Sequence, residues 1–238
     1  MIHSGLIPSV ITIGNLVCGF VALNYVMQGK YVPAAWLIVL AGTLDVLDGR
    51  IARFIGRDSK FGVELDSLAD VCSFGVVPAV MFAHAFLPTV LSGALACVFL
   101  LCGALRLARY NVLSHTGEKS ADIFLGLPIP AAAIILTQYI VFTEHAWETT
   151  HAASLGVALL AFVSFLMVSR IEYDSVPNFR SGRFWDRFKQ VYFLVTVGLI
   201  IHPNTSKDFF FPVVMVYLLF GLCRWVIGMF SDEVTQHA

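Results

Sequence analysis

Residues 45–70 read DVLDGRIARFIGRDSKFGVELDSLAD, and this stretch holds four aspartates at helical spacing. Asp45 and Asp48 are three residues apart, so they share one face of a helix. Asp66 and Asp70 are four residues apart and share a face of the following helix. Two adjacent antiparallel helices would bring all four carboxylates together at the same end. The stretch therefore predicts a helix pair that carries an acidic cluster.

The chain around this stretch is too apolar for a fold surrounded by water. Of its 238 residues, 58% are hydrophobic and 13% are charged, and the mean hydropathy is +0.81. A soluble domain carries about 25% charged residues. Long apolar stretches need lipid as their solvent, so we expect the bilayer to be a partner of this chain. The net charge of −1 gives no general attraction to nucleic acid, and none is expected to bind.

About 20 apolar residues cross a bilayer core as a helix, and eight stretches of the chain suit this role. They are residues 6–27, 31–53, 61–87, 91–111, 130–143, 151–168, 190–201 and 209–229. Pro88 divides the third stretch from the fourth, because proline is poorly tolerated inside a helix. The sequence therefore predicts an all-α integral membrane protein that crosses the bilayer several times.

The distribution of lysine and arginine predicts the orientation. With the N-terminus in the cytoplasm, the cytoplasmic loops receive twelve of these residues and the outer loops two, Lys30 and Lys207. Basic residues gather in the cytoplasmic loops of membrane proteins. We expect a bacterial inner-membrane protein whose N-terminus and acidic cluster face the cytoplasm. Residues 176–189, with three arginines and several aromatic residues, are either an amphipathic strip on the inner surface or a solvated basic loop.

The acidic cluster predicts a metal site. Four ionised carboxylates repel one another, so they require cations to lie close together. Oxygen ligands suit Mg²⁺ or Mn²⁺, and such ions bind phosphates and diphosphates well. Carboxylates clustered at a membrane are functional more often than isolated acidic helix caps are. We therefore predict two divalent ions on Asp45, Asp48, Asp66 and Asp70.

Small and basic residues near the aspartates predict room for a ligand. Gly49 and Ala52 leave the helix wall bare, so a flat base or a diphosphate can approach the backbone. Gly62 relaxes the start of the next helix. Arg53 is placed to pair with a phosphate or with one of the carboxylates.

The same stretch resembles the complete signature of the CDP-alcohol phosphatidyltransferase family. The pattern is Asp45-x-x-Asp48-Gly49-x-x-Ala52-Arg53, eight residues, and Gly62-x-x-x-Asp66-x-x-x-Asp70. In that family the first three aspartates hold metal, the last is the general base near the metal, and the glycine and alanine accommodate the cytidine nucleotide. The resemblance implies these roles for Asp45, Asp48, Asp66, Asp70, Gly49 and Ala52.

The family resemblance also implies a domain organisation and an oligomeric state. A catalytic core of six transmembrane helices is expected over residues 1–175. The interfacial segment 176–189 follows, and residues 190–238 then add two further transmembrane helices and a short tail. A homodimer is implied by the family alone.

Four further segments resemble the branch of the family that uses serine, the CDP-diacylglycerol–serine O-phosphatidyltransferases. They are ITIGNL at 11–16, FGVELDSLAD at 61–70 leading into SFG at 73–75, ALRLARYN at 104–111, and GLPIP at 126–130. Ser9 departs from the pattern, which has asparagine after the proline. The resemblance implies transfer of a phosphatidyl group from CDP-diacylglycerol to L-serine, which yields phosphatidylserine and CMP. Asp70 would take the proton of the serine hydroxyl.

Polar residues on other helices are candidates for substrate binding. The carboxylate of serine needs a fixed cation, and arginine suits it best. Arg106 and Arg109 lie at the cytoplasmic end of their helix. Arg109 is predicted to bind the serine carboxylate or a substrate phosphate. Alternatively, both arginines only set the orientation of the helix in the membrane. Asn15 and Thr12, three residues apart, either contact the nucleotide or bond to a neighbouring helix.

Two alternatives remain open from the sequence. A sister enzyme would use glycerol 3-phosphate or inositol phosphate, which need additional basic residues, or choline, which needs an aromatic cage. A metal-ion transporter would instead place its carboxylates near the bilayer midplane, often at broken helices. The clustering at one predicted membrane face favours the enzyme.

Overall fold

The computed structural model describes residues 6–55, 60–86, 90–116, 123–146, 150–174, 196, 198 and 203–236, with the side chains at some of these margins left out. The elements are α1 (Leu6–Met27), α2 (Tyr31–Ile55), α3 (Lys60–Asp70), the π-helical segment η1 (Val71–Val76), α4 (Val77–Phe86), α5 (Val90–Thr116), β1 (Ile123–Leu125), α6 (Ile129–Ala146), α7 (Thr150–Val168), β2 (Glu172–Asp174) and α9 (Pro203–Gln236).

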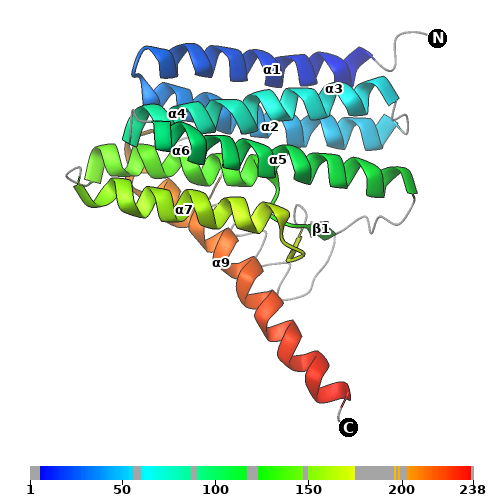
Figure 1. The fold of residues 1–238 in the computed structure, drawn as a ribbon. Helices are drawn as coiled ribbons and strands as arrows, with labels where there is room; N and C mark the ends of the chain where they lie inside the picture. The colour runs from blue at the N-terminus through cyan, green and yellow to red at the C-terminus, as the bar shows by residue number, and fades with distance from the viewer. Residues whose placement is uncertain are drawn as a thin grey trace.

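The helices from α1 to α7 lie side by side as a bundle, and α9 crosses it obliquely and extends away from it (Figure 1). Five helical stretches of the described chain are long and apolar enough to cross a membrane. They are Ser9–Met27, Tyr31–Ile51, Phe61–Phe86, Leu91–Leu113 and Asp208–Trp225, with Ile129–Glu144 and Ala153–Val168 as shorter apolar helices. The prediction of a helical protein with several apolar helices of membrane-spanning length is therefore confirmed.

Two of the predicted segments fall on residues that the structure leaves out. The helix predicted over 190–201 is described only at residues 196 and 198, which are helical, and the strip at 176–189 lies outside the described residues. The count of six core helices plus two remains a prediction for this reason.

Helix α1 shows how the bundle is held together in an apolar surrounding. Its buried positions follow a three-four spacing: Thr12, Asn15, Gly19, Ala22 and Val26. Large apolar side chains occupy the outward face, among them Val10, Val17 and Phe20. Small and polar residues at the seam allow close helix packing, whereas the outward residues suit lipid. A Cβ atom at position 19 would collide with Ser73, so α1 and η1 approach closely there.

Helix α6 forms the centre of the bundle. It contacts α2, α4, α7 and α9, and its buried residues occur on all sides. A helix that is apolar and buried all round belongs to the interior of a bundle. The buried apolar residues of α6 are Ile129, Ala132, Ala133, Ile135, Leu136, Ile140 and Val141. Helices α2, α4, α7 and α9 thereby pack around α6, whereas α1 packs on α2, α3 and α4.

The third predicted helix, over residues 61–87, is built in three consecutive pieces. The six residues of η1 follow directly after Asp70, and α4 continues the chain without a break. Such π-helical turns inside longer helices are frequent at functional sites. Inside this turn, the Ser73 hydroxyl donates a hydrogen bond of 3.1 Å to the main-chain carbonyl of Asn15. This contact joins η1 to the seam of α1.

The bundle also carries a short antiparallel ribbon, which the sequence analysis did not predict. Strands β1 and β2 pair Phe124 with Tyr173 at their centre. After β1 the chain turns at Gly126, whose φ of +78° favours glycine, and its N–H donates to the Ile171 carbonyl at 2.8 Å. Three-residue strands are too short to leave a periodic pattern in the sequence.

Candidate active site

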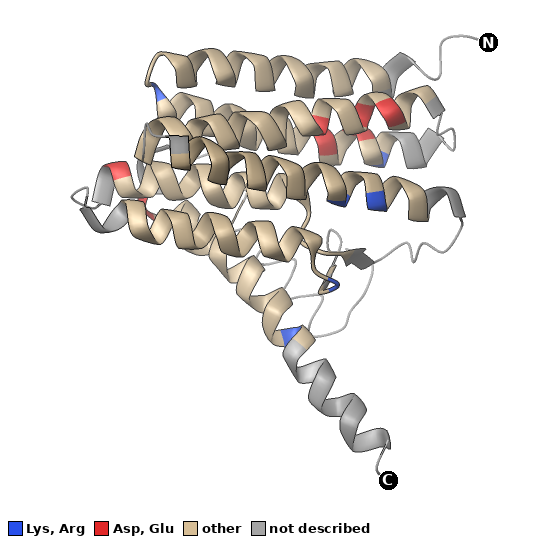
Figure 2. Cartoon of the chain, in the orientation of Figure 1, with Lys and Arg blue, Asp and Glu red and all other residues tan. Residues whose placement is uncertain are grey.

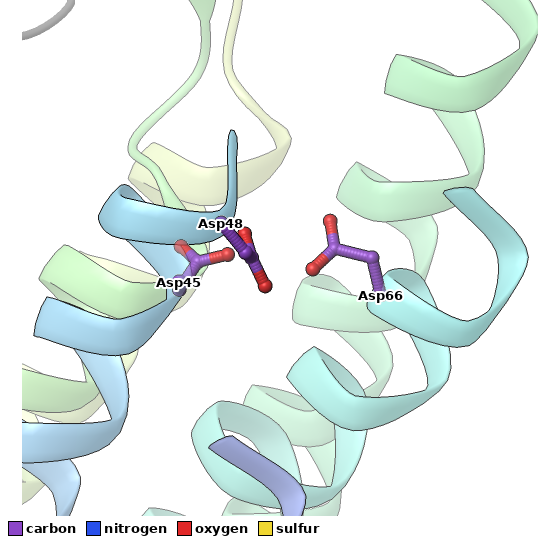
Figure 3. Close-up of side chains that lie close together, drawn as sticks. All are labelled: Asp45, Asp48 and Asp66. Carbon is purple, nitrogen blue, oxygen red and sulfur yellow. The ribbon is translucent and has the colours of Figure 1, made fainter. Parts of the chain in front are cut away.

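The acidic residues of α2 and α3 lie toward one end of the bundle, and the basic residues of α5 lie toward the same end (Figure 2). Asp45, Asp48 and Asp66 each offer a carboxylate oxygen, and these oxygens all lie within 4.8 Å of one another. Figure 3 shows the two side chains of α2 pointing toward Asp66 of α3. The predicted meeting of the two helix faces is therefore observed.

Asp70 occupies the inner side of this cluster. It lies one turn further along α3 than Asp66, it is only 6% exposed, and it interacts electrostatically with Asp45 and Asp66. It is the last residue of α3, directly before η1, and it is not among the three aspartates whose oxygens converge. One carboxylate is thus set apart from the group of three that converges on a common point.

The cluster fits a divalent metal ion. The donor set consists of carboxylate oxygens, the ligands that Mg²⁺ and Mn²⁺ prefer. The Oδ1 atom of Asp66 is buried and accepts no hydrogen bond from any residue that the structure describes. A buried charged acceptor without a partner is costly, and a cation at the centre of the three aspartates would satisfy it.

Helix α1 orients two of the aspartates. The Thr12 hydroxyl donates a hydrogen bond of 2.9 Å to Oδ2 of Asp48, and the Asn15 amide donates one of 3.2 Å to Oδ1 of Asp70. All four side chains are buried. Of the two roles predicted for Thr12 and Asn15, bonding to a neighbouring helix is therefore observed, and nucleotide contact stays a prediction.

Arg106 of α5 belongs to the site. The side chain is 6% exposed and interacts electrostatically with Asp70 and Asp45. Its guanidinium carbon lies 5.5 Å from the ring centroid of Tyr110, one turn later on the same helix. A buried cation requires anions around it, and the aspartates supply them from α2 and α3.

Arg109 makes a different set of contacts. Its guanidinium donates hydrogen bonds to the main-chain carbonyls of Val168 at 2.9 Å, Leu125 at 2.9 Å, Ser169 at 3.1 Å and Met167 at 3.3 Å. A cation satisfies the free carbonyls at a helix end, here the C-terminus of α7. Arg109 thus ties α5 to α7 and β1. The acceptor-binding role inferred for Arg109 from the sequence stays a prediction.

The small residues of the signature are placed as follows. A Cβ atom at Gly49 would meet nothing within 4 Å, so the helix wall beside Asp48 is open, as the sequence predicts. Gly62 lies near the start of α3 and is half-buried. Ala52 and Arg53 lie in the last turn of α2, but their side chains are outside the described part. Nucleotide contact by these four residues stays a prediction.

Two interactions of the site were not predicted from the sequence. The Asn111 amide donates a hydrogen bond of 2.8 Å to the Ser67 hydroxyl and so links α5 to α3. Tyr217 of α9 interacts electrostatically with Arg106 across more than a hundred residues of sequence. Asn111 and Ser67 both lie in the segments that resemble the serine branch, so a signal for the first contact was present. For Tyr217 the sequence holds no such signal.

The bundle contains helices long enough to cross a membrane, and its acidic cluster at one end suits a divalent metal ion. Together these features define a membrane protein with a candidate metal site. Residues 5–168 match the CDP-alcohol phosphatidyltransferase family. The CDP-diacylglycerol–serine O-phosphatidyltransferase of Helicobacter pylori strain J99 is 32% identical over 228 residues, which cover 94% of this chain and 92% of that protein. The one of Methanocaldococcus jannaschii is 31% identical over 222 residues, with coverage of 93% and 95%.

The fold is similar to a solved structure as well. The crystal structure of Mycobacterium tuberculosis phosphatidylinositol phosphate synthase with CDP-DAG bound aligns with a TM-score of 0.53 and 23% identity. The alignment covers 68% of this chain and 82% of that one. The chain belongs to the CDP-alcohol phosphatidyltransferase family. It is therefore a multi-pass membrane transferase of phospholipid biosynthesis.

Proposed function

We propose that this protein transfers the phosphatidyl group of CDP-diacylglycerol to the hydroxyl of L-serine, with phosphatidylserine and CMP as products. The observation that carries the proposal is the convergence of Asp45, Asp48 and Asp66 beside a buried fourth carboxylate, Asp70. The serine assignment is supported by relatives that bear this name and align over more than nine-tenths of the chain.

Asp45, Asp48 and Asp66 would hold the divalent ion, Mg²⁺ or Mn²⁺, and Asp70 would contribute to a second one. When bound there, such an ion neutralises the charge of the diphosphate and of the leaving CMP. Thr12 keeps the Asp48 carboxylate in place through its hydrogen bond, so the ligand geometry is set before substrate arrives.

Asp70 would act as the general base. The Asn15 amide donates a hydrogen bond to one of its oxygens, and the other oxygen would receive the substrate proton. The serine oxygen forms a bond to the lipid-side phosphorus while its proton passes to Asp70. The bond from that phosphorus to the bridging oxygen breaks, and CMP leaves with this oxygen.

The nucleotide would lie along the end of α2. Gly49 leaves the wall open beside the aspartates, and Ala52 continues that wall one turn later. Arg53 would pair with a phosphate, and Gly62 would allow close approach at the start of α3. Arg106, whose charge is buried beside Asp70, is the better placed of the two arginines for the acceptor, since Arg109 is bonded to main-chain carbonyls.

We also propose that the N-terminus and the site face the cytoplasm at the bacterial inner membrane, and that the protein is a homodimer. The first follows from twelve lysines and arginines on the inner side against two outside, and the second from the family alone. Serine and CMP would then exchange with the cytosol while the acyl chains of the lipid stay in the bilayer.

The experiment is CMP release by the purified protein in detergent. CDP-diacylglycerol and Mn²⁺ are supplied with serine, glycerol 3-phosphate, inositol phosphate or choline in parallel. We expect release with serine that depends on metal and is lost in Asp70→Asn. Release with another alcohol alone would overturn the serine assignment and keep the family. Metal binding without release for any acceptor would favour the transporter.

A further inference from the structure

Helix α9 lies beyond the residues that match the family. It packs against α6 and against β2 of the ribbon. Tyr217, near the middle of α9, is half-buried and interacts electrostatically with Arg106. Tyr217 therefore lies within electrostatic range of the buried cation, as the aspartates of α2 and α3 do.

The ribbon fixes the position of Tyr217. The Tyr173 ring of β2 lies with its centroid 6.0 Å from that of Tyr217. A Cβ atom at Gly221 would collide with the same Tyr173 ring, so only glycine allows this approach of β2 to α9. Gly221 and Tyr217 are four residues apart and share a face of α9. The ribbon therefore packs on the helix face that carries Tyr217.

Tyr173 provides an independent sign of a ligand. Its side chain is fully buried, yet its hydroxyl has no hydrogen-bond partner among the residues that the structure describes. Burial raises the pKa of the Tyr173 phenol to about 12, so the group is neutral and keeps its proton for donation. Buried polar groups are almost always paired, and an acceptor atom from a bound molecule would supply the missing partner.

The chemistry of Arg106 selects the kind of molecule. Arg106 is the one buried basic side chain among the residues whose side chains the structure describes. In serine, two carbon atoms separate the hydroxyl oxygen from the carboxylate carbon. A group that holds this carboxylate must therefore lie close to the base that takes the hydroxyl proton. Among the charged groups around Arg106, Asp70 has the strongest electrostatic interaction with it.

We propose that Arg106 and Tyr217 together bind the carboxylate of an amino-acid acceptor, with Tyr173 completing the donor set, so that α9 and the ribbon select the acceptor. This inference rests on the proposed function, because it assigns the acceptor side of the same site. Arginine with neutral hydroxyl donors suits a carboxylate, since all of them donate and none repels it.

The test compares Tyr217→Phe and Tyr173→Phe with the wild-type protein and with Tyr25→Phe. Tyr25 lies near the opposite end of α1 from Thr12, so it controls for the loss of a phenol hydroxyl elsewhere. Two measurements are made on the detergent-purified protein. One is calorimetric titration with L-serine in the absence of CDP-diacylglycerol, and the other is steady-state CMP release with each substrate varied.

We expect Tyr217→Phe to weaken serine binding and to raise the KM for serine about tenfold, the loss typical of one hydrogen bond to a charged group. The KM for CDP-diacylglycerol should stay within a factor of two. Ethanolamine lacks the carboxylate, so the preference of the enzyme for serine over ethanolamine should fall by the same factor. Tyr173→Phe should shift these values in the same direction, and Tyr25→Phe should leave them unchanged.

Other outcomes separate this inference from the proposed function. If the wild-type protein releases no CMP with serine, the proposed function fails. If serine is used but both variants keep its wild-type KM and affinity, the function stands and the inference is wrong. A raised KM for CDP-diacylglycerol alone would also overturn it, because Arg106 and Tyr217 would then serve the diphosphate.

Discussion

The hydrogen bond from Thr12 to Asp48 offers a direct test of how α1 prepares the site. The change is Thr12→Val, which keeps the branched shape of the side chain and removes the hydroxyl. The donor lies 2.9 Å from Oδ2 of Asp48, and both residues are buried. A hydrogen bond to a charged group contributes about 1.5–3 kcal/mol, which corresponds to roughly a 10–100-fold change in an equilibrium constant.

We expect this loss to appear in metal affinity, since partners that orient a ligand typically contribute about 10–100-fold to metal binding. The first assay is calorimetric titration of the purified protein with Mn²⁺. The second assay is CMP release at varied Mn²⁺ concentration. Thr137→Val is the matched control. That threonine is also buried, and its hydroxyl bonds at 2.8 Å to the Ala133 carbonyl within α6.

The control should lower the Tm at most slightly and leave the Kd for Mn²⁺ unchanged. If Thr12→Val binds Mn²⁺ with the wild-type Kd, or if both valine variants weaken binding equally, then α1 does not hold Asp48 for the metal. A lowered kcat at saturating Mn²⁺ with unchanged affinity would likewise contradict the reasoning, because the hydrogen bond would then act on the chemical step.

Three further changes test the packing that positions the site. Gly126→Ala places a Cβ against the Met167 carbonyl at a positive φ, and it should lower the free energy of unfolding by about 1–3 kcal/mol, measured as a fall in Tm. Gly19→Val forces α1 away from Ser73, so we expect lost activity together with reduced thermal stability, whereas an active, stable variant would refute the close contact. Arg109→Gln removes charged hydrogen bonds to four main-chain carbonyls and should therefore lower the Tm. A tenfold rise in the KM for serine at unchanged Tm would instead favour a role of Arg109 in binding the acceptor.

Much of the architecture could be read from local patterns. The apolar runs between residues 6 and 168 and the proline after the third run predicted where the chain is helical, because a helix in lipid must be long and apolar. Asp45, Asp48, Asp66 and Asp70 were predicted to converge from their spacing of three and four, and the structure brings the first three within 4.8 Å with Asp70 beside them.

Contacts between distant parts of the chain needed the tertiary structure. Arg106 and Arg109 are three residues apart at the same helix end, yet one lies beside Asp70 and the other caps α7. No local pattern separates them, because their roles depend on which elements pack against each side of α5. The same is true of the ribbon, whose strands are three residues each and pair across about fifty residues of sequence.

The sequence by itself determined the helical membrane class and the acidic cluster, since each depends on composition or on spacing within a few turns of helix, and its signature resembled the family. The tertiary structure alone decided that Thr12 and Asn15 hold aspartates, that Arg109 joins α5 to α7, and that Tyr217 of α9 interacts electrostatically with Arg106. The physical reason is that helical periodicity specifies which face of a helix is buried, whereas the partner of that face is set by the packing of the whole bundle.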